Sequence, residues 1–374
     1  MSRGTVRGTF ASHFHRRLRM SATPSVNLSE LERLQGKVIG DVAGTLGVLL
    51  AYIGDQTGVY RAMTDLGPAT AKQIAQQARV DERYAREWLS CNAAAGYVTY
   101  EAAHERFSLS PEQALVFARE GDPACMQGFF QLVVSQFLNE SRARQVFASG
   151  EGLPWGAHHA CCFCGVDRFF RPGYVAQLVG RWIPALDGVH ARLSRGGKVA
   201  DIGCGYGSST LIMAEAYPQS QFFGFDFHAP SIEEARARAQ RAGLPNVRFE
   251  VATAKTFSGT GYDLACIFDA LHDMGDPVSA ATHVRKSLSK DGAFMIVEPM
   301  AGDSLSENLN VLGQIFYAAS TLICCPTSKA QEVGLALGAQ AGQRRLTGVL
   351  NEAGFTRVRR AAETPLNMVL EARA

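Results

Sequence analysis

Short apolar stretches alternate with helical patterns through the C-terminal half of the chain. The strand-like stretches are residues 198–202, 221–226, 247–251, 262–268 and 293–297. The first two are followed by segments of helical periodicity, 208–216 and 231–243. Strands that alternate with helices predict a doubly wound α/β domain with a mostly parallel sheet, in which ligands bind at the carboxyl ends of the strands.

The first of these strands runs directly into a glycine-rich turn. Its sequence, Asp201-Ile-Gly203-Cys-Gly205-Tyr-Gly207, puts glycines at alternate positions before a helical segment. Such glycines let the backbone turn tightly and let a ligand lie against it. Dinucleotides prefer the spacing G-x-G-x-x-G, which rests a pyrophosphate on the helix N-terminus. Here the acidic Asp201 would repel a pyrophosphate and attract a cation. We therefore expect S-adenosylmethionine, which carries a sulfonium and an ammonium group, as the cofactor.

Acidic residues also follow later strands. Asp226 ends the second strand, 23 residues beyond Gly203, near the spacing at which a ribose-binding acid follows a glycine turn. Its carboxylate can accept hydrogen bonds from both ribose hydroxyls. Asp269 follows the fourth strand and Glu298 the fifth. We expect a ligand site at this edge of the sheet; glycines that serve packing only are the alternative.

The segment before this domain has a different pattern. Helices are expected at 31–53, 69–77 and 81–95, the last with Asp81 as its N-cap, and two short strands at 97–100 and 106–109. Helix, turn, helix and a two-stranded wing resemble a winged helix. The sequence therefore predicts a basic extension at 1–26, a winged-helix domain at 27–150, connecting helices that form a pocket wall at 151–190, and a cofactor domain at 191–374.

The C-terminal region resembles class I S-adenosylmethionine-dependent methyltransferases in its glycine turn and in Asp226. The resemblance implies a Rossmann-like, mostly parallel seven-stranded sheet that ends in an antiparallel hairpin, here at 355–361 and 368–371. It also implies cofactor-binding roles for Asp201, Gly203, Gly205, Gly207, Asp226, Phe227, Thr253 and Asp269. Many members have an acid after the third strand. This chain has Ala252-Thr253-Ala254 there, which leaves the Thr253 hydroxyl or the backbone to bind the adenine.

A winged helix joined to such a domain resembles plant and bacterial small-molecule O-methyltransferases, and also a group of actinobacterial winged-helix methyltransferases. In the small-molecule enzymes the winged module forms a homodimer, which makes the apolar helix 31–53 the expected dimer contact. The alternative is a DNA-binding regulator that senses S-adenosylmethionine. The presumed recognition helix carries three acids and two arginines in residues 81–87, whereas DNA-binding helices normally present a basic face. We therefore expect a small-molecule substrate rather than a nucleic acid.

Methyl transfer to an oxygen also requires a group that removes the acceptor's proton. Histidine is the usual base at neutral pH, and His272 follows the fourth strand. The run 271–276 resembles the His-Asp-Trp-Ser-Asp stretch of plant-type O-methyltransferases, whose histidine is the base. Glu298 is expected to orient His272, whereas Asp273 is not, because adjacent residues on a helix do not face each other. A histidine that only packs or caps the next helix is the alternative.

Further substrate contacts are expected from two other segments. His158 and His159 lie in the connecting region and are expected to face the substrate, with the aromatic run 169–174 over the cofactor. A plain linking helix is the alternative. Three cysteines follow these histidines, but adjacent ligands rarely converge on one ion, so no metal is expected. Tyr317 begins a helical insertion and, with Glu298, completes the substrate candidates.

Composition adds limits on location and partners. The net charge is +2, and five arginines fall within the first 20 residues, so the rest of the chain is slightly acidic. The basic start indicates a transit peptide or, as we prefer, a disordered extension before an internal start at Met20. Nine irregularly spaced cysteines favour a reducing cytoplasm. No apolar run reaches the roughly 18 residues that a membrane span needs.

Overall fold

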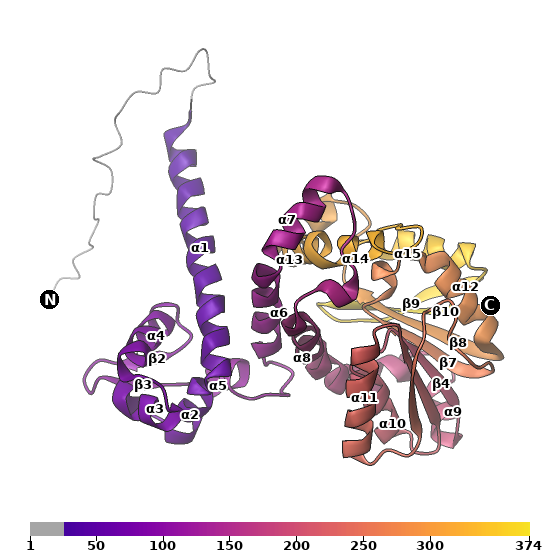
Figure 1. Cartoon of the computed structure of the whole chain (residues 1–374), viewed down its shortest axis with the longest axis horizontal. Coiled ribbons are helices and arrows are strands. Elements are labelled where there is room, and N and C mark those ends of the chain that lie inside the picture. The colour runs from indigo at the N-terminus through magenta and orange to yellow at the C-terminus, as the bar shows by residue number, and fades with distance from the viewer. Residues whose placement is uncertain (1–25) are drawn as a thin grey trace. The chain divides into compact units, whose positions relative to one another are not determined.

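The computed structural model describes residues 26–374 (Figure 1). Almost all of the expected basic extension, including its arginines and Met20, lies outside the described residues. The chain divides into two units, residues 1–46 and 47–374. Helix α1 (Leu28–Gln56) begins in the first unit and extends beyond the expected helix 31–53 at both ends. Its residues from 28 to 46 are all exposed.

The second unit begins with a winged helix-turn-helix module. Its elements are α2 (Val59–Leu66), β1 (Ala69–Thr70), α3 (Ala71–Ala78), α4 (Glu82–Ala94), β2 (Thr99–Glu101) and β3 (Arg106–Ser108), with strand order β1-β3-β2. Asp81 caps α4 as expected, by accepting a hydrogen bond from the amide of Tyr84. The prediction for α3 was wrong at its start. Thr70 pairs with Arg106 in the small sheet and caps α3, so the helix begins only at Ala71.

A series of helices connects this module to the large sheet. They are α5 (Pro111–Phe117), α6 (Gln127–Leu138), α7 (Glu140–Ser149), η1 (Trp155–Ala157), α8 (Ala160–Gln177) with its continuations η2 (Leu178–Trp182) and η3 (Ile183–Ala185), and α9 (Val189–Arg195). Helices α6 and α8 pack closely because each has a glycine at the contact. A Cβ at Gly128 would lie 2.3 Å from the carbonyl carbon of Arg168, and one at Gly165 would lie 2.7 Å from the Leu132 nitrogen.

The large sheet has seven strands in the order β6-β5-β4-β7-β8-β10-β9. They are β4 (Lys198–Ile202), β5 (Gln221–Asp226), β6 (Val247–Val251), β7 (Tyr262–Phe268), β8 (Leu288–Pro299), β9 (Arg357–Glu363) and β10 (Asn367–Arg373). The first five in this order are parallel, while β10 runs antiparallel to β8 and β9 antiparallel to β10. The predicted sheet and its terminal hairpin are confirmed, although β8 is longer than the expected 293–297.

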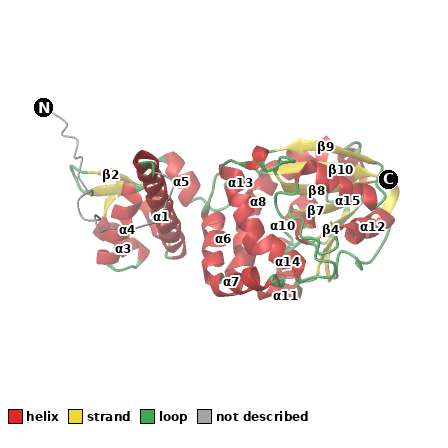
Figure 2. Ribbon diagram, turned by 90° about the horizontal axis from the view of Figure 1, so that it is seen from above, coloured by secondary structure: helices red, strands yellow, loops and turns green. Residues whose placement is uncertain are grey.

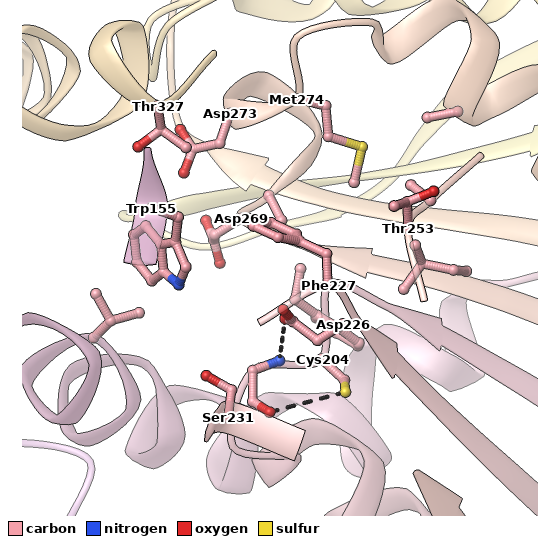
Figure 3. A pocket seen from close by; sticks show the side chains of 18 of the residues that line it. Trp155, Cys204, Asp226, Phe227, Ser231, Thr253, Asp269, Asp273, Met274 and Thr327 are labelled. Carbon is pink, nitrogen blue, oxygen red and sulfur yellow. Dashed lines mark hydrogen bonds between the residues drawn. The ribbon is translucent and has the colours of Figure 1, made fainter. Parts of the chain in front are cut away.

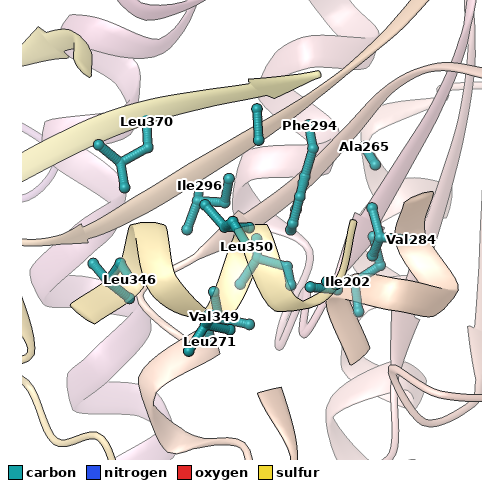
Figure 4. Close-up of a cluster of buried hydrophobic side chains, with 14 of the residues drawn as sticks. Ile202, Ala265, Leu271, Val284, Phe294, Ile296, Leu346, Val349, Leu350 and Leu370 are labelled. Atoms are coloured by element: carbon teal, nitrogen blue, oxygen red, sulfur yellow. The ribbon is translucent and has the colours of Figure 1, made fainter. Parts of the chain in front are cut away.

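Helices cover both faces of this sheet (Figure 2). The remaining helical elements are α10 (Ser208–Ala216), α11 (Ala229–Ala242), η4 (Leu271–Asp273), α12 (Pro277–Ser287), η5 (Ser306–Asn308), α13 (Val311–Ala319), η6 (Ser320–Cys324), α14 (Cys325–Lys329) and α15 (Gly342–Glu352). On one face, α12 and α15 pack Val284, Leu346 and Leu350 against Phe294 and Ile296 of β8 (Figure 4). On the other face, η2, α9 and α10 form a second buried cluster with β4, β5 and β7. The two clusters fix the carboxyl ends of the strands.

Two helical segments of the described residues are long and apolar enough to cross a membrane by length and composition, Leu28–Gln56 and Val311–Lys329. The second contributes Phe316, Ile323 and Cys324 to a buried cluster. The first is mostly exposed, and its apolar stripe is considered with the proposed function below.

Candidate functional site

A cavity of about 430 Å³ opens at the carboxyl ends of β4, β5 and β7 (Figure 3). The chain winds outward from β4 to β5 and β6, then crosses back to β7 and β8. Open α/β sheets bind ligands at such a switch point. The walls include Gly203 and Gly205 after β4, Asp226 at the end of β5, and Asp269 after β7.

The glycine turn forms one wall of the cavity. Gly203, Gly205 and Gly207 have φ values of 74°, 53° and 77°, in the region that favours glycine. The amides of Gly203 and Cys204 donate to the carbonyl of Phe225, which anchors the turn to β5. A Cβ at Gly205 would meet no atom within 4 Å, whereas one at Gly207 would lie 2.5 Å from Cζ of Phe249. Gly205 therefore leaves room for a ligand, and Gly207 serves packing and does not line the cavity.

Asp226 lies at the cavity floor with its carboxylate held in place. Its Oδ2 accepts from the amide of Gly205 at 2.9 Å and its Oδ1 from the amide of His228 at 2.8 Å. The side chain is 8% exposed, and this burial raises its pKa above the ordinary value. Each oxygen keeps a lone pair for a further donor, which suits two adjacent hydroxyls of a ribose. Phe227 and Thr253 also line the cavity.

Asp201 lies behind the turn and not in the cavity wall. It is fully buried, and its Oδ2 accepts from the hydroxyls of Ser209 at 2.7 Å and Thr210 at 2.6 Å. Burial raises its pKa to about 6. Oδ2 of Asp201 therefore fixes the first turn of α10, while its buried Oδ1 has no hydrogen-bond partner among the described residues. The expected attraction to a cationic ligand stays a prediction.

Asp269 is held in an unusual backbone conformation at the end of β7. Its φ of 47° is rare for a residue with a side chain. Its carboxylate accepts from the Tyr174 hydroxyl at 3.1 Å and from the Asn367 side-chain amide at 2.7 Å. Desolvation, with Glu298 nearby, raises its pKa to about 8. Asp269 lines the cavity, as expected for a cofactor-binding residue.

His272 lies on the 3₁₀ turn η4 between two carboxylates. Its Nδ1 is 2.5 Å from Oε2 of Glu298, and its Nε2 is 3.1 Å from Oδ1 of Asp273. Glu298 also accepts from the amide of Leu271. The expected pairing with Glu298 is present. The expectation for Asp273 was wrong, because residues 271–273 form a 3₁₀ turn rather than an α-helix. Although His272 is buried, both carboxylates raise its pKa well above the ordinary value.

Asp273 is the member of this group that faces the cavity. It lines the cavity with Met274 and Thr327, whereas His272 and Glu298 do not. In the view of Figure 3, Asp273 and Thr327 lie together, away from Asp226 and the glycine turn.

The other substrate candidates do not line this cavity. His158 is buried; its Nδ1 is 3.2 Å from the Asn139 side-chain nitrogen, and its Nε2 is 3.5 Å from the Thr327 hydroxyl. Burial lowers its pKa. His159 caps α8 by accepting from the amide of Cys161. Tyr317 lies on α13 and is absent from the cavity wall formed by the described residues. Of these three, His158 is the one that contacts a cavity-lining residue, through the Thr327 hydroxyl.

Sequence reasoning missed several residues of the cavity wall. They come from η4 and from the stretch after α14: Asp273, Gln331 and Glu332. Trp155, Phe163 and Asp167 line the cavity from the segment 151–190, which was expected to form a pocket wall, but none of the three was singled out. Phe170 and Tyr174 do lie in the wall, as the aromatic run predicted. Asp167 belongs to no motif that indicates a ligand site. It accepts a hydrogen bond from Ser208 at 2.5 Å and pairs with Arg238 at 2.9 Å, contacts that only the fold creates.

Comparisons with known families match two parts of the chain. Residues 193–354 match the methyltransferase domain family Methyltransf_31, and residues 44–119 match the Rv2258c-like winged helix-turn-helix domain. Among curated relatives, an uncharacterized methyltransferase of Bacillus subtilis is 32% identical over 32% of this chain and 47% of its own length. A trans-aconitate 2-methyltransferase of Deinococcus radiodurans is 32% identical over 30% of this chain and 42% of its own length. The chain thus spans less than half of these two relatives.

Solved structures match nearly the whole chain in fold. Mitomycin 7-O-methyltransferase has a TM-score of 0.68 at 17% identity and covers 93% of this chain and 100% of its own. Human N-acetylserotonin methyltransferase, solved with S-adenosylmethionine, has a TM-score of 0.65 at 15% identity and covers 95% of this chain and 99% of its own. Residues 193–354 therefore form a methyltransferase domain, preceded by a Rv2258c-like winged helix-turn-helix domain at residues 44–119, and the chain shares the fold of these solved methyltransferases.

Proposed function

We propose that the whole protein transfers a methyl group from S-adenosylmethionine to an oxygen of a small molecule. The observation that carries this proposal is a single cavity with a cradle for the cofactor at one part and the Asp273–His272–Glu298 group at another. Both structural neighbours reported above are named as small-molecule methyltransferases, which supports the same class of acceptor.

The residues present fit the cofactor. Gly205 leaves space at the turn, and Asp226 offers two fixed carboxylate oxygens. Phe227 is half exposed beside them, where it can contact an adenine ring. We propose that Gly203 and Gly205 bind the amino-acid part, Asp226 the ribose, and Phe227 and Thr253 the adenine. Asp269 faces the same cavity, and the cofactor's positive charge would favour its ionised form.

The cofactor supplies an already activated methyl group, so the protein has to align the acceptor and remove its proton. Asp273 is the carboxylate that reaches the cavity wall. We propose that it receives the acceptor hydroxyl's hydrogen bond and that His272, when neutral, takes the proton through it. Because the two carboxylates raise the pKa of His272 well above its ordinary value, the neutral form is favoured only as pH rises. Glu298 holds His272 by Nδ1, which leaves Nε2 free at 3.1 Å from Oδ1 of Asp273.

The acceptor is expected to be largely apolar and aromatic. Trp155, Phe163 and Phe170 line the cavity together with Met274. Such side chains bind flat rings, while a few polar groups fix the orientation. A panel of phenolic metabolites, incubated with the full-length protein and S-adenosylmethionine, tests the proposal. Mass spectrometry should detect methylated product with at least one phenol. Transfer only to amines or thiols would contradict methylation at oxygen.

We propose that the protein is a homodimer joined through α1. Apolar side chains recur every three or four residues along this helix and are 40–55% exposed: Leu31, Leu34, Val38, Val42, Leu46, Leu49 and Ile53. A stripe of this length is typical of a helix that packs against a partner helix. A second copy supplies an identical stripe, so the two copies can form a two-fold symmetric interface that leaves no stripe unpaired.

DNA binding by the winged module is not favoured by its charges. On α4, Arg83 pairs with Glu87 and Arg86 with Glu82, so neither arginine is free to neutralise a phosphate without breaking an ion pair. We propose a cytoplasmic location. The nine cysteines, all within the described residues, form no disulfide, as in most proteins of that compartment.

A further inference from the structure

Three chemically different ligand groups converge beside the cavity, where the sequence indicated no metal. They are Nε2 of His272, an Oδ of Asp273 and Sγ of Cys324, and these atoms all lie within 4.8 Å of one another. His272 and Asp273 belong to η4, while Cys324 ends η6 from the insertion after β8. His272 and Cys324 are 3% and 5% exposed. The fold therefore brings an imidazole, a carboxylate and a thiol together in a largely dry place.

Glu298 orients the imidazole of this group. Its Oε2 lies 2.5 Å from Nδ1 of His272, and an ionised carboxylate can only accept. The Nδ1 proton therefore belongs to this hydrogen bond, and Nε2 points toward Asp273 and Cys324. A carboxylate behind the distal ring nitrogen is the usual support of a metal-bound histidine, because it fixes the tautomer and raises the basicity of the ligand nitrogen.

Oδ1 of Asp273 would be expected to accept a hydrogen bond from His272 if the group were held together by hydrogen bonds alone. Its Oδ1 is buried and receives no hydrogen bond from any described residue, although Nε2 of His272 is only 3.1 Å away. The geometry therefore does not direct a proton on Nε2 at this oxygen. A cation placed between Nε2, Oδ1 and Sγ would contact all three.

We propose that His272, Asp273 and Cys324 form a site for a divalent transition-metal ion, with Zn²⁺ as the best fit. Zinc takes nitrogen at about 2.0–2.1 Å, carboxylate oxygen at about 2.0–2.2 Å and thiolate sulfur at about 2.3 Å. The three ligand atoms lie within 4.8 Å of one another, so they would have to draw together around an ion to meet these lengths. Cys324 binds as the thiolate, and its proton leaves to solvent.

Three protein ligands leave the fourth tetrahedral position open, as in catalytic zinc sites. Of the three ligands, Asp273 lines the cavity, which gives a small molecule a route to the ion. Binding of the metal does not depend on the proposed methyl transfer. Only the occupant of the fourth position, a water or the acceptor's oxygen, rests on the proposed function. A metal-bound Nε2 no longer accepts a proton, and the metal would instead lower the pKa of the bound hydroxyl.

Cobalt(II) spectroscopy of the full-length, chelator-treated protein tests the site without any substrate. Cobalt should bind in one equivalent and give the intense visible bands of a four-coordinate ion and a thiolate-to-cobalt charge-transfer band. Cys324→Ser should lose the charge-transfer band, while Cys91→Ser, at an exposed cysteine, should retain it. Competition with zinc should show that Glu298→Gln weakens metal binding by about 10–100-fold.

The site would be overturned if cobalt gives only the spectrum of the hydrated ion. It would also be overturned if Cys324→Ser and His272→Gln both keep the wild-type spectrum and zinc affinity, because the metal would then lie elsewhere. Circular dichroism and thermal melting of each variant establish that it is folded. Cys324→Ser changes only a sulfur to an oxygen, so this variant alone tests the site if substitution of the buried Glu298 by Gln prevents folding. The cobalt spectrum and the zinc affinity do not depend on catalytic activity, so the result would stand even if the protein did not transfer methyl groups.

Discussion

At the scale of single residues, burial and charge set the chemistry of the cavity. Asp226 ends β5, Asp269 follows β7 and Asp273 ends the turn η4, and the three carboxylates differ in surroundings. Asp226 is fixed by two backbone amides, Asp269 by a tyrosine and an asparagine, and Asp273 by its contact with His272. These surroundings suit the role proposed for each: Asp226 binds the ribose, Asp269 is ionised beside the cofactor's positive charge, and Asp273 receives the acceptor's hydrogen bond.

His272 should matter for turnover rather than for cofactor binding, since it does not line the cavity. We expect His272→Gln to lower kcat by about 10²–10⁴-fold, the usual contribution of a general base, with S-adenosylmethionine affinity changed by less than about threefold. Steady-state kinetics with an identified acceptor and calorimetry measure the two effects. A loss of kcat under about tenfold, which is about 1.4 kcal/mol, would remove His272 from the proton transfer. His159→Gln, at an exposed helix cap, is the matched control.

Asp269 should make the cofactor-free protein less stable as pH rises. Its pKa is raised to about 8 in the folded protein, against about 3.9 when unfolded. The folded state therefore binds more protons between these values, so the stabilisation present below about pH 4 is lost as pH rises through about 8. Thermal melting should show a smaller decline between about pH 5 and about pH 8 in Asp269→Asn than in the wild type. Exposed Asp65→Asn should leave the decline unchanged; an equal decline in Asp269→Asn would contradict this role.

At the scale of elements, one glycine of the turn leaves space for the ligand and another allows close packing, and the sequence pattern does not show which is which. Gly205 faces open space, while Gly207 touches Phe249 and Ala235. We expect Gly207→Ala to reduce the free energy of unfolding by about 2–4 kcal/mol, because the new methyl group overlaps a buried ring at positive φ. Gly205→Ala should cost only about 1–2 kcal/mol of backbone strain but weaken S-adenosylmethionine binding. Urea unfolding and calorimetry compare the pair. Equal destabilisation would contradict the assigned roles.

The elements themselves could largely be predicted, and their side-chain roles could not. Alternation of apolar strands with helices predicted β4 to β7, and the resemblance to class I methyltransferases implied the hairpin β9–β10. Asp201 illustrates the limit. Its place in the motif predicts contact with the ligand, but the motif does not predict that Ser209 and Thr210 donate hydrogen bonds to its Oδ2 behind the turn. His272 and Cys324 lie far apart in sequence, and only the helical insertion after β8 brings them together.

At the scale of the whole molecule, the apolar stripe of α1 should determine the oligomeric state. We expect Leu34→Glu to convert a dimer to a monomer, because a charge within the stripe would be buried without a partner. Arg33→Glu introduces the same side chain on the opposite side of the helix and should leave the dimer intact. Sedimentation velocity measures both, and circular dichroism checks that α1 remains helical. A monomeric wild-type protein at micromolar concentration would refute the dimer.

The central claim is that the cavity at the ends of β4, β5 and β7 binds S-adenosylmethionine with Asp226 on the ribose. Isothermal titration calorimetry of the full-length protein tests it most directly. The wild type should bind one cofactor per chain, and Asp226→Ala should lose about 10–100-fold in affinity, since hydrogen bonds to a charged group contribute about 1.5–3 kcal/mol. Binding of S-adenosylmethionine with unchanged affinity by a folded Asp226→Ala variant, or no binding by the wild type, would contradict the claim.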